Sequence, residues 1–152
     1  MHRLTEIDCW EENQYRIQFV WHDLRSEIND LIGRKLGSFD YIFHLAAASH
    51  VDRSIDDPMS FVMDNVVGTC NLLNYARGNL FDEGKVFNFS TDEVFGPAPD
   101  GMNFKEDARW KPSNPYSATK AGQTALGYCY YVTYGLPVIT TYAMNNFGER
   151  QH

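Results

Sequence analysis

The chain has 152 residues, a net charge of −7 at pH 7 and 14% aromatic residues, which suits one folded domain and argues against a disordered chain. The acidic balance, without a basic block, disfavours nucleic acid and membrane surfaces as partners and favours small molecules. No apolar run suggests a membrane span or an export signal, and Cys9, Cys70 and Cys129 form no C-x-x-C pair, so we expect a cytoplasmic protein without a disulfide framework or metal site.

The first third of the chain predicts a strand, a helix and a second strand. Residues 1–13 have no clear period and predict a loop or a weak edge element. An apolar run predicts a strand at 16–21, and apolar residues at helical spacing predict a helix at 24–36 that stops at Gly37. A short buried strand at 41–45 then leads into small residues, which would let a cofactor approach the backbone closely.

A long helix and a buried strand come next. Asp57 has the character of a helix cap, Pro58 suits the first turn, and Gly78 is the expected stop of this helix. The apolar run at 85–90 predicts the following strand, and Gly and Pro residues at 96–101 predict a loop.

A third helix is predicted at 116–134, with Gly135 as its stop and a last strand at 138–142. Strands that alternate with helices predict an α/β fold with right-handed crossovers. We expect one partial Rossmann-like domain over residues 1–152: a doubly wound parallel sheet with helices on both faces.

Tyr116 and Lys120 form a candidate catalytic pair, since residues four apart share one face of a helix. Free tyrosine has a pKa of about 10, so a tyrosine that acts as a base near neutrality needs a nearby cation such as Lys120. Thr91 ends the preceding strand, where ligands of open α/β sheets bind, and can hydrogen-bond the same substrate oxygen. Taken alone, such a pair is more often an ordinary feature of a helix surface.

Two adjacent carboxylates, Asp92 and Glu93, follow Thr91. They are either surface acids of a turn or an acid–base pair. In general, two carboxyl groups near one substrate can be driven to different protonation states, so that one donates a proton and the other accepts one. Taken alone they are more often surface acids, but their occurrence together with Tyr116 and Lys120 favours the acid–base pair.

The chain resembles the extended short-chain dehydrogenase/reductase superfamily and, within it, nucleotide-sugar 4,6-dehydratases of the dTDP-glucose type. The resemblance rests on five segments: HLAAASHVDRS at 44–54, NVVGT at 65–69, STDEVFG at 90–96, PYSATKAG at 115–122 and NNFG at 145–148. Thr-Asp-Glu is the most discriminating piece, because related sugar-nucleotide epimerases share the Tyr and Lys but usually lack both acids.

The resemblance implies a lyase that uses NAD in nucleotide-sugar metabolism. Tyr116 would deprotonate the sugar C4 hydroxyl, with Lys120 supporting the tyrosine and Thr91 orienting the hydroxyl, while NAD takes the C4 hydride. Glu93 would then remove the C5 proton and Asp92 would protonate the departing C6 hydroxyl, before the hydride returns to C6.

The resemblance also implies two sets of binding residues. The implied cofactor contacts are Asp23, Leu24, Leu45, Ala46, Ala47, Ser90, Tyr116 and Lys120. The implied substrate contacts are Ser49, Thr91, Asn145 and Asn146. Two residues have structural alternatives, because Asp23 can cap the following helix and Asn65 can satisfy a neighbouring loop backbone.

The chain also departs from the family pattern. It contains no G-x-G-x-x-G after a first strand and resembles about half of a family member, without the first strand–helix–strand unit and most of the substrate domain. The absent strands would leave a gap between the strands at 16–21 and 41–45, to be closed by direct pairing, a partner chain or an oligomer. Tyr142 and Glu149 stand where the family usually has Arg and Pro.

Three functions therefore stay open. The first is the catalytic part of an NAD-dependent nucleotide-sugar dehydratase, and the second is a non-catalytic remnant that acts as an interaction subunit. The third, a sugar-nucleotide 4-epimerase, leaves Asp92 and Glu93 without a proton to transfer. The implied partners are a nucleotide sugar and a second copy of the chain, docked through the helices that begin near Pro58 and Tyr116.

Overall fold

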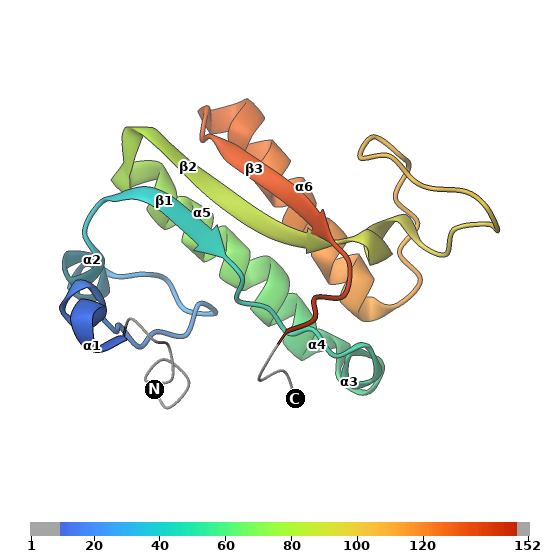
Figure 1. Cartoon of the computed structure of the whole chain (residues 1–152), viewed down its shortest axis with the longest axis horizontal. Coiled ribbons are helices and arrows are strands. Elements are labelled where there is room, and N and C mark those ends of the chain that lie inside the picture. Colours follow the sequence, from blue (N-terminus) through green and yellow to red (C-terminus); the bar gives the residue numbers. More distant parts are fainter. Residues whose placement is uncertain (1–9, 149–152) are drawn as a thin grey trace.

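A computed structural model describes residues 10–148, and its sheet has three parallel strands in the order β1-β2-β3 (Figure 1). The strands are β1 (Phe39–His44), β2 (Leu80–Thr91) and β3 (Val138–Ala143). Phe43 of β1 lies opposite Phe87 of β2, which lies opposite Ile139 of β3. The α/β class and the Rossmann-like parallel sheet are thus confirmed.

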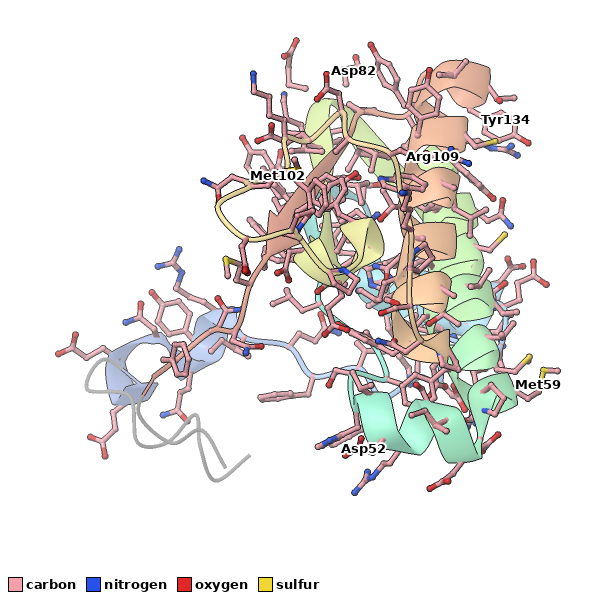
Figure 2. All side chains as sticks on the ribbon, turned by 90° about the vertical axis from the view of Figure 1, so that its right-hand side faces the viewer. Asp52, Met59, Asp82, Met102, Arg109 and Tyr134 are labelled. Atoms are coloured by element: carbon pink, nitrogen blue, oxygen red, sulfur yellow. The ribbon has the colours of Figure 1, made fainter. Side chains whose placement is uncertain are left out.

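The two connections between the strands are helical, and their long helices lie on one face of the sheet, whereas the first three helices precede β1. The bounds of the helices are α1 (Trp10–Asn13), η1 (Gln14–Arg16), α2 (Asp30–Leu36), α3 (Val51–Asp56), α4 (Pro58–Phe61), η2 (Val62–Val67), α5 (Gly68–Asn79), η3 (Asp92–Phe95) and α6 (Pro115–Tyr134). The segment η2 is a π-helical stretch that joins α4 to α5. Figure 2 shows α5 and α6 on the same side of the sheet.

The core lies between this sheet face and the two long helices. Leu73 and Ala76 of α5, Val86 of β2, Tyr130 of α6 and Leu136 are all buried there. Alternate residues of β2 point into this layer, which explains why Val86 is 0% exposed while its neighbours are not buried. Burial of these apolar side chains holds the helices at the sheet and fixes the start of α6 near the strand ends.

The opposite face of the sheet carries aromatic side chains. Phe43 and Phe87 stack with ring centroids 4.8 Å apart, and Tyr41, Phe43 and Ile139 are 57%, 59% and 41% exposed. The described helices that pack on the sheet, α5 and α6, lie on the other side. We predicted helices on both faces of the sheet. Residues 10–148 place helices on one face.

The predicted strand at 16–21 is wrong. Arg16 ends η1, residues 17–23 pair with no strand among the described residues, and Trp21 is 87% exposed. A strand is stabilised by its neighbours, and the apolar pattern of this stretch has no neighbour to pair with. Direct pairing with β1 therefore does not close the expected gap.

The predicted helix at 24–36 begins later than expected. It starts at Asp30 because the side chain of Asn29 accepts a hydrogen bond from the backbone N–H of Ile32 at 3.1 Å. Its predicted stop at Gly37 is confirmed, with φ of 73°. The loop or weak edge element expected at residues 1–13 is wrong for residues 10–13, which form the helix α1. The rest of that expectation, at residues 1–9, and the departure at Glu149 lie outside the described residues.

The later elements follow the sequence closely. Asp57 caps α4 by accepting from Ser60 N at 3.2 Å, and Gly135 ends α6 in the left-handed conformation with φ of 68°. Helix α5 ends at Asn79, one residue beyond Gly78, and β2 is longer than predicted at both ends. The short helix α3 was not predicted.

Within residues 10–148, no helix combines the length and apolar character that a bilayer crossing needs.

Candidate active site

The carboxyl end of β2 turns sharply and presents two carboxylates. Thr91 Oγ1 accepts a hydrogen bond from the Glu93 N–H at 3.3 Å and donates one to Asp92 Oδ1 at 3.2 Å. These bonds cap the single turn of η3, which ends at Gly96 with φ of 78°. A Cβ at Gly96 would collide with the carbonyl oxygen of Lys111, so the turn requires glycine there. The turn thus fixes both carboxylates beside Thr91.

The start of α6 is tied to this turn. Asn114 caps the helix: its Oδ1 accepts from Ser117 N at 2.7 Å, and Ser117 Oγ in return accepts from Asn114 N at 3.2 Å. The other end of the Asn114 amide, Nδ2, donates to Glu93 Oε2 at 3.1 Å. One side chain therefore both begins the helix that carries Tyr116 and holds the carboxylate of Glu93.

Helix α3 supports Tyr116 from the other side. The Tyr116 N–H donates to Ser54 Oγ at 3.1 Å, and Ser54 Oγ donates to Val51 O at 2.6 Å. The Tyr116 ring meets Phe61 edge to face at 6.5 Å and is 9% exposed. These contacts give the phenol one defined place near the strand ends.

The surroundings of Tyr116 act on its acidity. Burial raises the pKa of Tyr116, the Thr91 hydroxyl lowers it, and the charges of Glu93 and Asp92 raise it. Thr91, Asp92 and Glu93 therefore all act on the pKa of this phenol. The structure thus brings these four predicted residues together at the end of β2.

Lys120 lies one turn further along α6 and is 4% exposed. Its Nζ donates to Phe89 O and to Gln123 Oε1, each at 2.6 Å, and burial lowers the pKa of Lys120 to about 8. Because the pKa of Tyr116 is raised in this structure, the lowering that we expect from Lys120 stays a prediction.

A pocket of about 470 Å³ gathers several of the predicted cofactor residues. It is lined by His22, Asp23, Leu24, Arg25, Ala46, Ala47, Ala48 and Asp64. Two segments far apart in the sequence thus meet, as the resemblance implies. Leu45 is 65% exposed and does not line this pocket.

Asp23 does not cap a helix, so that structural alternative is wrong. Its carboxylate pairs with Arg25, with Nη2 2.6 Å from Oδ2, and accepts the Arg25 backbone N–H at 3.0 Å. Hydrogen bonds from Arg25 lower the pKa of Asp23 to about 2. Arg25 Nε also lies 3.7 Å from Asp64, so one guanidinium links two carboxylates at the pocket rim.

The remaining predicted binding residues are more dispersed. Ser49 lines an adjoining pocket of about 500 Å³ that shares Ala47, Ala48 and Asp64 with the first. Ser90 is 5% exposed and accepts from Thr124 of α6 at 2.7 Å, so it faces the helix layer. Asn145 and Asn146 are exposed and line neither pocket. The structure thus does not bring the two asparagines to the site.

A further pocket of about 630 Å³ lies beside the carboxylates. Asp92, Glu93, Phe95, Tyr142 and Met144 are among its lining residues. It lies where a substrate could meet both acids, and Tyr142, which departs from the family pattern, forms part of its wall.

Among residues 10–148, no group of three or more His, Cys, Asp or Glu side chains could hold a metal ion.

Asn65 serves the structural role that we gave as an alternative. Its Oδ1 accepts from Ala48 N at 2.8 Å, and its Nδ2 donates to Ala48 O at 3.0 Å and to Thr119 Oγ1 at 2.9 Å. The residue lies in the π-helical stretch η2, a type of distortion that often accompanies functional sites. Asn65 thereby fixes the loop that lines the first two pockets.

Sequence reasoning missed three supporting residues, Ser54, Asn114 and Gln123. Asn114 carried a signal, because Asn followed by Pro is a common helix start and places the cap one residue before Pro115. Gln123 also carried one, since it is three residues after Lys120 on the same helix face. Ser54 acts across a tertiary contact that no local pattern reveals.

A parallel α/β sheet with a threonine at a strand end and a buried Tyr-x-x-x-Lys pair on the next helix defines the class of short-chain dehydrogenases/reductases. The family described as GDP-mannose 4,6 dehydratase matches residues 1–152, so the chain belongs to that family. This agrees with the resemblance found in the sequence motifs.

Individual relatives point the same way. A dTDP-glucose 4,6-dehydratase of Haemophilus influenzae is 46% identical over 121 residues, which are 74% of this chain and 36% of that protein. DesIV, a dTDP-glucose 4,6-dehydratase of Streptomyces venezuelae solved with NAD and TYD bound, superposes with a TM-score of 0.86 at 39% identity, covering 99% of this chain and 44% of that one.

Epimerases are structural neighbours as well. The UDP-N-acetylglucosamine 4-epimerase of Methanobrevibacter ruminantium has a TM-score of 0.77 at 31% identity, covering 88% of this chain and 41% of that chain. The chain thus spans less than half the length of each of these relatives.

Proposed function

We propose that this chain supplies the catalytic residues of an NAD-dependent nucleotide-sugar 4,6-dehydratase. The observation that carries the proposal is the meeting of Thr91, Asp92 and Glu93 with Tyr116, in which Asn114 joins Glu93 to the start of α6. An alcohol oxidation needs the tyrosine and the threonine, and a loss of water needs two further groups for proton transfer. The site contains both sets.

Each residue then has one task. Tyr116 removes the proton of the sugar C4 hydroxyl, which Thr91 holds by a hydrogen bond, and Lys120 stabilises the phenolate. Once C4 is a ketone, the C5 proton is acidic, and Glu93 removes it. Asp92 protonates the C6 hydroxyl, which leaves as water. Bound NAD would accept the hydride from C4 and return it to C6, while Glu93 returns a proton to C5.

The residues around the 470 Å³ pocket fit part of NAD. The small side chains of Ala46, Ala47 and Ala48 leave the backbone open to a ligand, and Asp23 offers carboxylate acceptors to hydroxyl or amino groups. The chain has no G-x-G-x-x-G loop to bind the pyrophosphate. We therefore expect weak NAD binding and little turnover by the chain alone.

The proposed substrate is a nucleotide sugar, and the proposed compartment is the cytoplasm. We also propose a homo-oligomer through the helices that begin near Pro58 and Tyr116. Exposed apolar side chains on these helices support it: Met59, Tyr128, Tyr131 and Val132 are 66%, 69%, 56% and 61% exposed.

A 4-epimerase is the second candidate, because 4-epimerases share the fold and are structural neighbours. It explains Tyr116, Lys120 and Thr91 but gives Asp92 and Glu93 no proton to transfer. The pair of acids held in the capped turn η3 therefore favours the dehydratase.

Calorimetric titration of the 152-residue chain with NAD, followed by incubation with dTDP-glucose and NAD, tests the proposal. A 4-keto-6-deoxy sugar product that disappears in Tyr116→Phe is the expected result wherever turnover is measurable. A 4-epimer as the product would favour the second candidate. Absence of NAD binding up to millimolar concentration would favour a non-catalytic interaction subunit.

A further inference from the structure

Three polar side chains are buried together between β2 and α6. Asn88 and Gln123 are 0% exposed and Lys120 is 4% exposed. Lys120 Nζ donates to Gln123 Oε1 at 2.6 Å, and Gln123 Nε2 donates to Asn88 Oδ1 at 2.6 Å. Polar groups in a core cost free energy unless every one is paired, so this row has a fixed arrangement.

Asn88 decides which way the Gln123 amide faces. A glutamine amide has one acceptor end and one donor end, and Asn88 Oδ1 can only accept. The donor end of Gln123 is therefore bound to Asn88, and the acceptor end faces Lys120. Asn88 is itself oriented by a 3.4 Å hydrogen bond from its Nδ2 to the Gln123 carbonyl. A Cβ at Gly127 would approach Asn88 Nδ2 to 3.1 Å, so glycine leaves room for this asparagine.

We propose that Gln123 is a positioning residue for Lys120, holding its ammonium group by one hydrogen bond while Phe89 O holds it by another. An ammonium has three N–H donors, so one remains for a ligand. Two fixed acceptors restrict the flexible lysine side chain to one direction. Without them, a ligand would have to order this side chain on binding, and the lost conformational freedom would weaken the binding. The inference rests on the proposed function for the use of Lys120, whereas the Gln123–Lys120 contact can be tested without any ligand.

Few titratable groups face Lys120. From β1 it is His44, whose pKa is lowered to about 4 by burial and by the charge of Lys120, so His44 is neutral near pH 7. The titratable group of α6 on this side is Tyr116, one turn before Lys120. Asp92 and Glu93 of η3 lie beyond Tyr116. Among residues 10–148, Gln123 is thus the side-chain acceptor within hydrogen-bonding distance of the ammonium.

The test is an NMR titration of lysine ¹³Cε signals in the 152-residue chain, with the Lys120 signal assigned by Lys120→Met. Gln123→Met has nearly the same shape without the acceptor, and the Lys120 pKa should fall by about one pH unit. Gln123→Glu places a carboxylate there and should raise it by at least about one pH unit. The matched control is Thr124→Val on the same helix as Gln123. It removes a buried hydroxyl that lies within hydrogen-bonding distance of Ser90 Oγ and of the Lys120 backbone carbonyl, but not of the ammonium group, and should leave the Lys120 pKa unchanged.

A Lys120 pKa in folded Gln123→Met equal to that of Thr124→Val would overturn the inference. If Gln123→Met does not fold, Gln123→Glu decides, because a Lys120 pKa that is not raised beside a carboxylate excludes the contact. The titration uses neither NAD nor sugar, so its failure is distinct from the failure of the dehydratase assay. A dehydratase product together with an unmoved pKa would refute only the role of Gln123.

Discussion

His44 should make the fold sensitive to acid. The residue ends β1, is 2% exposed, and has Nε2 2.7 Å from Thr69 Oγ1. Thr69 donates its own hydroxyl proton to Asn65 O at 2.6 Å, so its oxygen can only accept from the histidine. His44 is therefore the Nε2–H tautomer. A second proton would place a charge in the core, close to the cation of Lys120.

The size of the effect follows from linkage. Burial lowers the pKa of His44 from 6.5 to about 4, so the unfolded chain binds a proton more readily than the folded one between these values. The contribution to stability is complete above pH 6.5 and decreases as the pH falls toward 4. At 1.36 kcal/mol per pH unit, the loss relative to pH 7 is about 2 kcal/mol at pH 5 and about 3 kcal/mol at pH 4.

Urea denaturation at pH 7, 6, 5 and 4 measures the effect when the wild type is compared with His44→Gln. Glutamine does not titrate and still offers an N–H to Thr69, so the variant should lose about 2 kcal/mol less than the wild type between pH 7 and pH 5. His50→Gln, at an exposed histidine, is the control and should behave as the wild type. Equal acid sensitivity of wild type and His44→Gln would refute the reasoning.

Core packing, helix capping and the carboxylate pair each lead to a further prediction. Leu73→Ala should lower the free energy of unfolding in urea titrations by about 3 kcal/mol, because Leu73 is 1% exposed in the core. Leu31 is 64% exposed, so the control Leu31→Ala should change the free energy of unfolding by less than about 0.5 kcal/mol. Asn114→Ala should cost about 1 kcal/mol by loss of the cap, and Asn114→Ser should recover most of it in thermal melts; equal losses would argue against the cap. In a preparation that turns over, Glu93→Gln should stop exchange of the C5 hydrogen with deuterated water, and Asp92→Asn should keep the exchange but slow the loss of water by at least about 100-fold. Exchange that survives in Glu93→Gln would exclude Glu93 as the base.

The elements that the sequence predicts well are those whose local signals agree with their environment. The strand β2 is an apolar run whose alternate residues from Gly84 to Ser90 are buried, β3 is an apolar run that pairs with it, and α6 ends at Gly135, which takes the left-handed conformation. The stretch at 16–21 has a similar apolar pattern but no neighbouring strand, and a ladder depends on its partner. The local sequence pattern does not reveal whether a partner strand is present.

For the candidate site, the sequence points to the proposed reacting groups more directly than to the residues that support them. Thr91 and Tyr116 stand at a strand end and a helix start, where topology predicts that they meet. Ser54 accepts a hydrogen bond from the Tyr116 N–H across 62 residues, and Asn145 follows the last strand and does not line the three pockets described at the site. Such contacts depend on the packing angle of α3 and the path of the chain after β3, which residue spacing does not specify.

The Asn65 amide gives the site a mechanical property. It holds both backbone groups of Ala48 and also donates to Thr119 Oγ1, whose proton in turn goes to Tyr116 O at 2.8 Å. A force on the pocket loop is therefore transmitted through two side chains to the backbone of the tyrosine. These hydrogen bonds couple the pocket loop to the start of α6, so a ligand that displaces Ala48 should also shift the backbone of Tyr116.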